Sequence, residues 1–538
     1  MRSGRSDALG RVIGAILAAT LALSPVHARK KQADLPPPTT GLVDNVNGIA
    51  VGKGGALQRF NGLLIGGDGR VERRLSRDDK RPDRLLYRLD GEGRTLIPSF
   101  IDSHTNVIAA GLTVMTLDLS TTGSLADALS KVTSNMRANP GKKWILGRGW
   151  DAARWARISG QPERLPTAAD LDTAVSDRPA FLLSDDGEMG WANTVALRQA
   201  GIAAPQKALT GEALRKMRLI VPSPAPKDRD IALDKAQQLY LARGISTVAD
   251  MGTTIEDWQA YRRAGDRGAI RLRIVGYADT VENMALIAGS APSPWLYEDH
   301  LRLSGVLFTL DGTLAARTAW IKAPLAGTSQ GPTGGRIEQT RLRNWMSRAA
   351  MDGFQIAIAA HGDAAFAEAV DAIGELAATY GGDRRWRIEG PEQIDTTGTA
   401  RLIAPGTYIS VSRASLDAFS SAAGGSERTF LFSSGASALP ASPFDSLAAA
   451  MRHSMPAGEP DGSIDGFAPA FSAATSVSAF ALFGETRIGS LASGQHADFL
   501  ILDRDISTAS PDAIEHTRIL EHWIDGKRVF KADAAGNM

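Results

Sequence analysis

The sequence contains no cysteine, which excludes disulfide bonds and thiolate metal ligands. Neither sign of charge prevails, because 60 Lys and Arg residues balance 59 Asp and Glu residues. The chain therefore has no electrostatic reason to bind nucleic acid. Long hydrophobic runs are also scarce, and the most extended one lies near the N-terminus. Stability must come from packing, for which 538 residues offer ample core, in one large domain with a smaller companion or in two to three domains.

The N-terminal run has the features of a secretory signal. Three arginines precede the apolar residues 12–23, which lead into the small-residue stretch SPVHA. We predict a signal peptide over residues 1–28, cleaved after Ala28, and hence a periplasmic or secreted protein without a membrane anchor. The alternative of a membrane span is disfavoured because the run is too short to cross a bilayer.

The two ends of the mature chain share a strand and turn texture. Residues 29–44 are charged and then proline-rich, and are predicted to form a linker. Short apolar runs with Asp-Gly turns follow, and the same pattern returns at ADFLILDRD and HWIDGKRVF near the C-terminus. We expect one β-sandwich domain built from residues 45–97 and 485–538.

Apolar runs alternate with helix-length segments across residues 98–484. Examples are WILGRGW, ISTVA, RLRIVGYA, GVLFTL and FQIAIAA. This alternation indicates parallel strands with crossover helices, and the number of units favours a (β/α)8 TIM-like barrel in an α/β protein. A doubly wound parallel sheet is the alternative.

The stretch FIDSHTNV, residues 100–107, places a histidine and an asparagine two residues apart. Residues i and i+2 of a strand point to the same side, so a pair of histidines at this spacing could share a metal ion. Here only His104 could act in this way. Asn106 occupies the second position, and an amide is a much poorer zinc ligand than imidazole.

Several motifs, in order along residues 45–530, together resemble those of amidohydrolase family 3 of the metal-dependent hydrolase superfamily. They are TLIPSFIDSHTN, ILGRGWDAARW, SDDGEMGWANTVAL, GVLFTLDGTLAARTAW, HGDAAFAEAVDA, RIE and GSLASGQHADFLILDRD. The resemblance implies a barrel with a composite β-sandwich, a divalent metal and hydrolysis of non-peptide C–N bonds in a small amide-type substrate.

Carried over by position, the family pattern has lost most of its metal ligands in this chain. His104 alone survives. The degenerate ligand positions are Asn106, Leu307, Ala359, Gly390 and Gly435, the last of which replaces the catalytic aspartate. Ser99 also replaces the glycine of the first motif. The resemblance therefore identifies no catalytic residue, and a metal acting as a Lewis acid would lack its usual support.

Two interpretations of the remaining polar residues stay open. His361 and Glu188, with His104, Asp102 and Asp363, could form a shifted metal site. Alternatively, His361 caps a helix start and Glu188 is a solvated loop charge, which we favour because a metal site needs several ligands in register. No cofactor is expected unless zinc or another divalent metal occupies a shifted site.

The resemblance also implies a substrate pocket. The residues matched to it are Trp150, Asp151, Glu188, Trp191, Asp311 and Arg317. The alternative is that the tryptophans belong to the core and that Asp311 makes a turn; for Arg317 we expect a carboxylate partner or Asp311 itself. The sequence thus supports two hypotheses, an exported amidohydrolase with an altered metal site, or a non-catalytic periplasmic protein that binds a small molecule or stabilises a related subunit.

Overall fold

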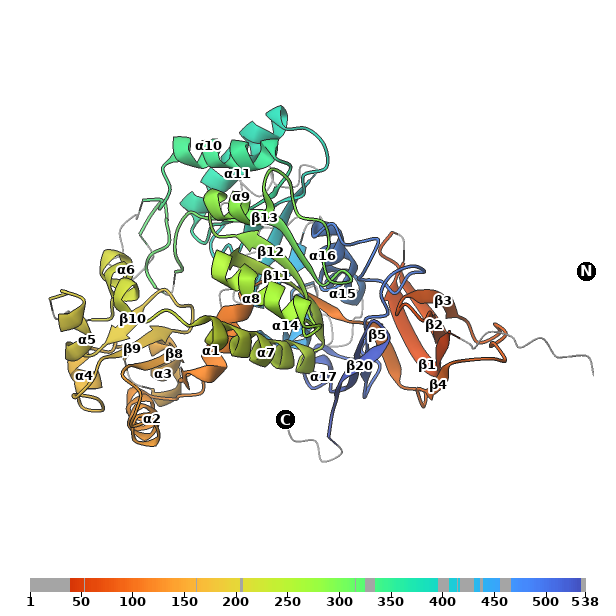
Figure 1. Ribbon diagram of the computed structural model, residues 1–538, viewed down its shortest axis with the longest axis horizontal. Coiled ribbons are helices and arrows are strands. Elements are labelled where there is room, and N and C mark those ends of the chain that lie inside the picture. The colour runs from red at the N-terminus through yellow and green to blue at the C-terminus, as the bar shows by residue number, and fades with distance from the viewer. Residues whose placement is uncertain are drawn as a thin grey trace, which may run out of the picture. The chain divides into compact units, whose positions relative to one another are not determined.

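Two segments from opposite ends of the chain form a single β-sheet (Figure 1). In this computed structural model, the described residues are 39–52, 54–160, 162–203, 207–314, 316–324, 334–394, 406–413, 415–416, 430–435, 439–454 and 466–533. The sheet consists of β1 (Gly41–Val51), β2 (Leu57–Ile65), β3 (Val71–Leu75), β4 (Tyr87–Asp90), β5 (Thr95–Pro98), β18 (Phe499–Leu502), β19 (Ile519–Ile524) and β20 (Lys527–Lys531). The strand β18 pairs antiparallel with β5, which joins the C-terminal strands to the N-terminal ones.

Eight parallel strands form the barrel. They are β6 (Phe100–Thr105), β11 (Ile245–Thr253), β12 (Arg273–Ala278), β13 (Leu301–Thr309), β14 (Gln355–Ala359), β15 (Trp386–Glu389), β16 (Thr407–Val411) and β17 (Phe430–Phe432). Most of their residues are buried, as expected for strands covered on both faces. The predicted barrel with a composite β domain is confirmed.

The first and last barrel strands meet through side chains. The hydroxyl of Ser103 on β6 donates to the Phe432 carbonyl of β17 at 2.8 Å. Just beyond β17, the Ser434 N–H donates to the Asp102 carboxylate at 3.0 Å. These contacts bring β6 and β17 together at the seam of the barrel.

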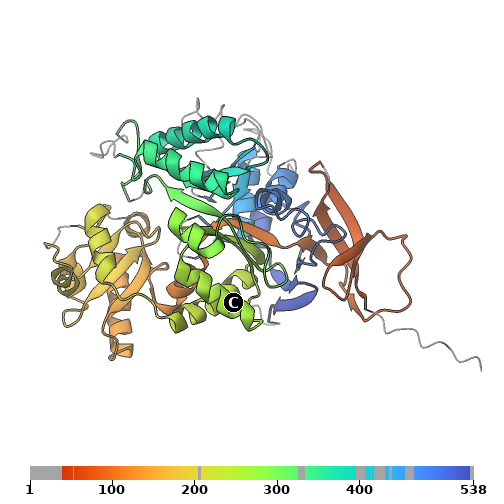
Figure 2. The ribbon, with the colours of Figure 1, turned by 45° about the horizontal axis from the view of Figure 1, so that its top comes forward.

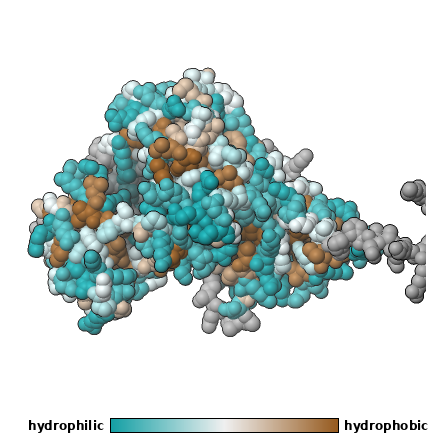
Figure 3. All heavy atoms as spheres, in the orientation of Figure 1, coloured by the Kyte–Doolittle hydropathy of each residue, from teal (hydrophilic) through white to brown (hydrophobic). Residues whose placement is uncertain are grey.

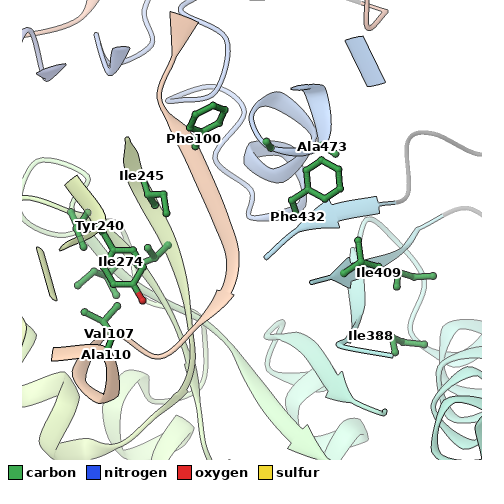
Figure 4. Close-up of a cluster of buried hydrophobic side chains, with 14 of the residues drawn as sticks. Phe100, Val107, Ala110, Tyr240, Ile245, Ile274, Ile388, Ile409, Phe432 and Ala473 are labelled. Carbon is green, nitrogen blue, oxygen red and sulfur yellow. The ribbon is translucent and has the colours of Figure 1, made fainter. Parts of the chain in front are cut away.

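Helices cover the outer face of the barrel strands (Figure 4). They are α1 (Val107–Met115), α7 (Pro226–Ala242), α8 (Ile255–Asp266), α9 (Val281–Ala288), α10 (Gln339–Met351), α11 (Asp363–Thr379), α14 (Pro443–Ser454), α15 (Phe467–Ala473) and α17 (Pro511–Glu515). The helix α16 (Ser476–Ala481) packs instead against apolar residues of the barrel interior. Figure 4 shows Ile274, Ile388, Ile409 and Phe432 in the buried cluster between strands and helices. Because successive strand residues point to opposite faces, the residues between these positions point into the barrel interior.

A lobe is inserted between α1 and α7 (Figure 2). It contains β7 (Leu117–Asp118), β8 (Ile145–Trp150), β9 (Ala180–Ser184), β10 (Gly190–Ala192), α2 (Leu125–Ala138), α3 (Ala152–Ser159), α4 (Ala168–Asp172), α5 (Thr194–Gln199) and α6 (Gly211–Ile220). Its strands form a separate four-stranded sheet. The expectation that WILGRGW, now β8, alternates within the barrel is therefore wrong, because an apolar strand pattern does not specify the sheet that the strand joins.

The N-terminal boundary of the sheet also differs from the sequence interpretation. The strand β1 begins at Gly41, inside the predicted linker 29–44, because Leu42 and Val43 are buried between neighbouring strands. The predicted signal peptide, residues 1–28, and linker residues up to 38 lie outside the described residues. Within the described part of the chain, every helix is too short or too polar to cross a membrane.

The face of the molecule drawn in Figure 3 is mostly hydrophilic, with hydrophobic side chains gathered over the positions of α6 and α9. The side chains of Leu219 on α6 and Leu286 on α9 are 75% and 73% exposed. Scattered exposed leucines of this kind are common on soluble domains.

Candidate active site at the barrel mouth

The carboxyl ends of the barrel strands carry a group of polar side chains. His104 lies at the end of β6, Glu389 ends β15, and Asp311 and His361 follow β13 and β14. In a barrel of this type, the carboxyl ends of the strands form the face on which catalytic residues gather. The candidate site is therefore the mouth at this end.

His104 is oriented by a buried carboxylate. Its Nδ1 lies 2.9 Å from Glu389 Oε2, while Glu389 Oε1 accepts from Arg387 Nε at 2.7 Å. Burial alone would raise the pKa of Glu389, but Arg387 and His104 outweigh it and hold that pKa below its usual range. The Nε2 atom of His104 makes no hydrogen bond within the described residues, so it is free to meet a ligand.

A chain of polar side chains continues from this pair through the barrel interior. Arg387 also donates to the Ser103 carbonyl, and its Nη1 lies 3.3 Å from the Tyr277 hydroxyl. Tyr277 donates in turn to Gln355 Oε1 at 2.5 Å. Because burial disfavours the phenolate, the pKa of Tyr277 is raised, and this hydroxyl stays a donor. A chain of hydrogen-bonded polar side chains therefore runs through the barrel interior beside its apolar residues.

A second histidine and carboxylate pair lies at the mouth. Asp311 accepts from the backbone N–H groups of His361, Gly362 and Trp320 at 2.8–2.9 Å. It also lies 3.3 Å from His361 Nδ1. Burial lowers the pKa of His361, but the hydrogen bond and charge of Asp311 outweigh burial, and the pKa is raised. His361 bonds Asp311 rather than capping α11, so the predicted capping role is wrong.

Asn106 is used by the backbone. Its side-chain oxygen accepts from Ala109 N–H at 2.8 Å and caps α1, and its amide nitrogen donates to the Met251 carbonyl at 3.3 Å. Nearby, Leu307 packs against the apolar residues of the barrel interior, and Ala359 is buried at the end of β14. None of these three side chains presents an uncommitted donor to the mouth.

Glycines occupy the other two ligand positions, and both adopt left-handed backbone conformations. The φ angles are +62° at Gly390 and +68° at Gly435. A Cβ atom on Gly390 would lie 3.2 Å from His361 Nε2, and one on Gly435 would lie 3.1 Å from the Ser412 Cβ. The backbone therefore favours glycine at both positions, and His361 fills space that a side chain at 390 would need.

The inserted lobe contacts the mouth through an acidic segment. Asp186 Oδ2 accepts from the Thr313 hydroxyl at 2.5 Å, and Glu188 Oε2 accepts from Arg336 Nη2 at 2.5 Å. Glu188 thus forms an ion pair and is not a solvated loop charge. This pair holds the lobe against the loop that follows β13.

The residues predicted for a shifted metal site are not brought together. Asp102 bonds the hydroxyl and N–H of Ser434, and Asp363 accepts from Lys322 N–H at 2.9 Å. Throughout the described ranges, no three His, Cys, Asp or Glu side chains are close enough to share a metal ion. At the mouth, His104 with Glu389 and His361 with Asp311 therefore form two hydrogen-bonded pairs that do not share a metal site.

The predicted pocket tryptophans lie in the core of the lobe. Trp150, Trp155 and Trp191 are at most 4% exposed, with ring centroids 6.1–6.5 Å apart. The indole N–H groups of Trp150 and Trp191 donate to the carbonyls of Leu182 and Thr167. This placement favours the interpretation that the tryptophans stabilise the lobe.

Two other pocket candidates have structural contacts. Asp151 caps α3 by accepting from Arg154 N–H at 3.0 Å. The Arg317 side chain is 52% exposed and lies 3.9 Å from Glu163 Oε1. A carboxylate partner for Arg317 was expected, but it is Glu163 rather than Asp311.

Sequence reasoning missed three acidic residues at the mouth, Glu389, Glu392 and Asp186. Glu392 accepts from Leu314 N–H at 2.8 Å, and burial raises its pKa. A useful signal was available for Glu389, since a charged residue that closes an otherwise apolar strand points to a buried partner. No sequence pattern of this kind distinguishes Glu392 or Asp186 from other loop residues.

Comparisons with known proteins agree with this architecture. A model described as the amidohydrolase family matches residues 89–419 and 436–530. Protein LONG AFTER FAR-RED 3 of Arabidopsis thaliana is 28% identical over 498 residues, covering 82% of this chain and 83% of that protein. The N-substituted formamide deformylase of Arthrobacter pascens is 28% identical over 203 residues, 34% of this chain and 36% of that protein.

A solved structure of similar fold is an uncharacterized metal-dependent hydrolase from Pyrococcus horikoshii OT3. Its TM-score is 0.67 at 19% sequence identity, with 88% of this chain and 99% of that chain covered. The structural likeness supports the fold, and the family model matches most of the sequence, from residue 89 to residue 530 with a short gap. The chain belongs to the amidohydrolase family.

Proposed function

We propose that this chain is an exported member of the amidohydrolase family that binds a small molecule at the barrel mouth and does not carry out metal-dependent hydrolysis. The observation that carries the proposal is the chemistry of the ligand positions. Leu307, Ala359, Gly390 and Gly435 offer no donor atom, and the Asn106 amide is committed to capping α1.

The divalent metal implied by the family does not fit this donor set. Zinc requires three or four nitrogen, sulfur or oxygen ligands from the protein. His104 is the one histidine left at those positions, and its Nδ1 is already held by Glu389. A single imidazole with no converging partner would bind zinc weakly.

The retained polar groups support a ligand-binding role for the mouth. His104 and His361 are each oriented by a carboxylate, and their Nε2 atoms make no hydrogen bond within the described residues. Fixed polar groups at a barrel mouth are what a small-molecule site needs. The expected partner is a small molecule rather than nucleic acid or membrane, and self-association stays open.

Metal content of the full chain, produced in an exporting host, tests the proposal. We expect well under one metal ion per chain by plasma mass spectrometry, both as purified without chelator and after incubation with zinc. His104→Ala should leave this value unchanged, as should the control His516→Ala in the exposed C-cap of α17. About one ion per chain that disappears in His104→Ala alone would overturn the proposal.

A second candidate function is hydrolysis of a C–N bond without a family-type metal centre. Its support is the pair of Glu389 and His104, which resembles a carboxylate-oriented general base. The similarity to the formamide deformylase favours the same substrate class. Release of formate from N-substituted formamides, abolished by His104→Gln, would favour this candidate over binding alone.

Export follows from the sequence of residues 1–28. The apolar run 12–23, preceded by Arg2, Arg5 and Arg11, supports recognition by a secretion pathway. N-terminal sequencing of the exported protein should begin at Arg29. Retention in the cytoplasm with an intact N-terminus would contradict the export part of the proposal.

A further inference from the structure

A cavity of about 400 Å³ lies at the end of the barrel opposite the mouth. Its walls come from the first residues of β13 and β14 and from the segment that precedes β15. Arg302 and Ser304 contribute the polar wall on β13, and Phe354 and Phe483 contribute apolar surface. All residues that line this cavity are described.

Arg302 is the unusual residue of the cavity. Its Nε is buried without a hydrogen-bond partner, and its Cζ lies 5.5 Å from the centroid of the Trp295 ring. Burial lowers the pKa of Arg302, and the charge of Arg487 lowers it further. Within the described residues, no carboxylate lies in ion-pair distance of this guanidinium.

The three most deeply buried arginines among the described residues have acidic partners. Arg273 contacts Asp498 and Asp525, Arg385 contacts Asp383 and Glu485, and Arg387 contacts Glu389. Burying a cation without such a partner is costly. Arg302 thus has the charge and the free donors that an anion would satisfy.

The rest of the cavity wall suits an anion with an apolar part. Ser304 is 2% exposed, and its hydroxyl has no protein partner among the described residues. Arg384 adds positive charge, although two of its N–H groups already donate to the carbonyls of Gly381 and Ala350. The lining carboxylate of Asp383 pairs with Arg385, whose guanidinium nitrogens lie 2.6–3.0 Å away and which also pairs with Glu485.

Glycine keeps one side of the cavity open. Gly382 has a φ of +96°, and a Cβ built on it would meet no atom within 4 Å. The positive φ angle favours glycine at this position. The empty space around it leaves room for a ligand to enter the cavity.

We propose that this cavity binds a small organic oxyanion, whose carboxylate or phosphate group pairs with Arg302 and whose apolar part packs against Phe354 and Phe483. A guanidinium offers two parallel N–H donors to such a group. The site lies at the opposite end of the barrel from the mouth, so it stands independently of the proposed function.

Calorimetric titration of the full chain with sodium benzoate and with sodium phosphate tests this site, with sodium chloride at equal ionic strength as the salt control. We expect saturable binding of at least one probe to the wild type. Arg302→Gln should weaken that binding by about ten- to a hundredfold, the range expected for loss of a charge-assisted pair. Binding of benzoate alone identifies a carboxylate ligand, and binding of phosphate alone identifies a phosphate ligand.

Two further variants separate binding from folding. Arg302→Lys keeps the charge but loses the two-pronged geometry, so it should weaken binding less than Arg302→Gln does. Arg137→Gln removes an exposed arginine from α2 in the lobe and should leave binding unchanged. Because Arg302 lacks an acidic partner, the melting temperature of Arg302→Gln should be no lower than that of the wild type. If Arg302→Gln fails to fold, the binding affinity of Arg302→Lys relative to the wild type tests whether Arg302 binds the anion.

Two results would overturn the proposal. One is the absence of heat from both probes at millimolar concentrations. The other is equal binding by the wild type, Arg302→Gln and Arg302→Lys, which would mean that the anion sits elsewhere on the surface.

Discussion

Two buried histidines, one at the barrel mouth and one where the sheet meets the barrel, have opposite electrostatic surroundings. His361 at the barrel mouth lies beside Asp311, which raises its pKa despite burial. His522, on β19 where the sheet meets the barrel, contacts the Ser99 hydroxyl and the Leu241 carbonyl, both at 2.9 Å. Burial among these neutral partners lowers the pKa of His522 to about 4.

The difference indicates what each region is built for. At the junction of sheet and barrel, Arg273 pairs with Asp498 and Asp525, and burial holds His522 neutral. His300 and His496 also contact Asp525. The mouth instead keeps carboxylate-oriented imidazoles with free Nε2 atoms. Junction residues therefore contribute to stability, whereas mouth residues are available to a ligand.

The largest expected effect is at the junction. Arg273→Met removes a fully buried cation, which leaves Asp498 without its ion-pair partner and Asp525 with His300 and His496 alone. We expect the free energy of unfolding to fall by about 3–5 kcal/mol in urea denaturation, the usual cost of breaking a buried pair. Lys216→Met, which breaks an exposed pair with Glu212, should change it by under about 1 kcal/mol. Equal effects of the two variants would contradict the comparison.

The second prediction concerns acid sensitivity at the same junction. The folded pKa of His522 is about 4, below the unfolded value of 6.5, so below pH 6.5 the unfolded chain binds a proton that the folded chain excludes. Stability from this residue is therefore complete above pH 6.5. As pH falls from 6.5 to 4, it should decline by about 1.4 kcal/mol per pH unit.

His522→Asn removes this titration. The difference in unfolding free energy between the wild type and this variant should shrink steadily from pH 7 to pH 4.5. A constant difference for His522→Asn would mean that His522 is not held neutral.

The sequence predicted the barrel and the composite β domain, because alternation of strands and helices and turn-rich ends are local patterns. It did not predict the inserted lobe, since β8 and β9 have the same apolar pattern as barrel strands and only long-range pairing separates the two sheets. Ser99 is a second case in which a long-range contact could not be predicted from local sequence. It was noted as a replacement for glycine, but its partner His522 is distant in the sequence.

For the candidate site, the sequence named His104, His361 and Asp311 but not how they pair. The bond between His361 and Asp311 depends on the relative position of β13 and β14, which spacing along the chain does not encode. The tryptophans were equally ambiguous, because an aromatic residue can line a pocket or fill a core. Burial decided between these interpretations in the structure.

The third prediction tests why the mouth has glycine at a ligand position. Gly390→Ala places a side chain at φ +62°, which costs about 1–2 kcal/mol for a residue other than glycine. The added Cβ would also lie 3.2 Å from His361 Nε2. The double variant Gly390→Ala with His361→Ala relieves this contact and should recover part of the loss seen in urea denaturation. No loss in the single variant would show that position 390 accepts a side chain freely.

The smallest expected effect is at His361, with a pH dependence opposite to that of His522. Its pKa is raised in the folded chain by Asp311, with added influence from Glu392 and Glu188. The stability that this pair contributes is therefore complete below pH 6.5 and is lost as pH rises through the folded pKa.

His361→Gln should lower the free energy of unfolding by about 0.5–1 kcal/mol at pH 6, the range for one long hydrogen bond, and by less at pH 9. Measured in an Asp311→Asn background, the effect of His361→Gln should lose this pH dependence, because the charge that raises the pKa of His361 is then absent. A loss that grows towards pH 9 would place His361 in the neutral class with His522 and remove the electrostatic contrast between mouth and junction.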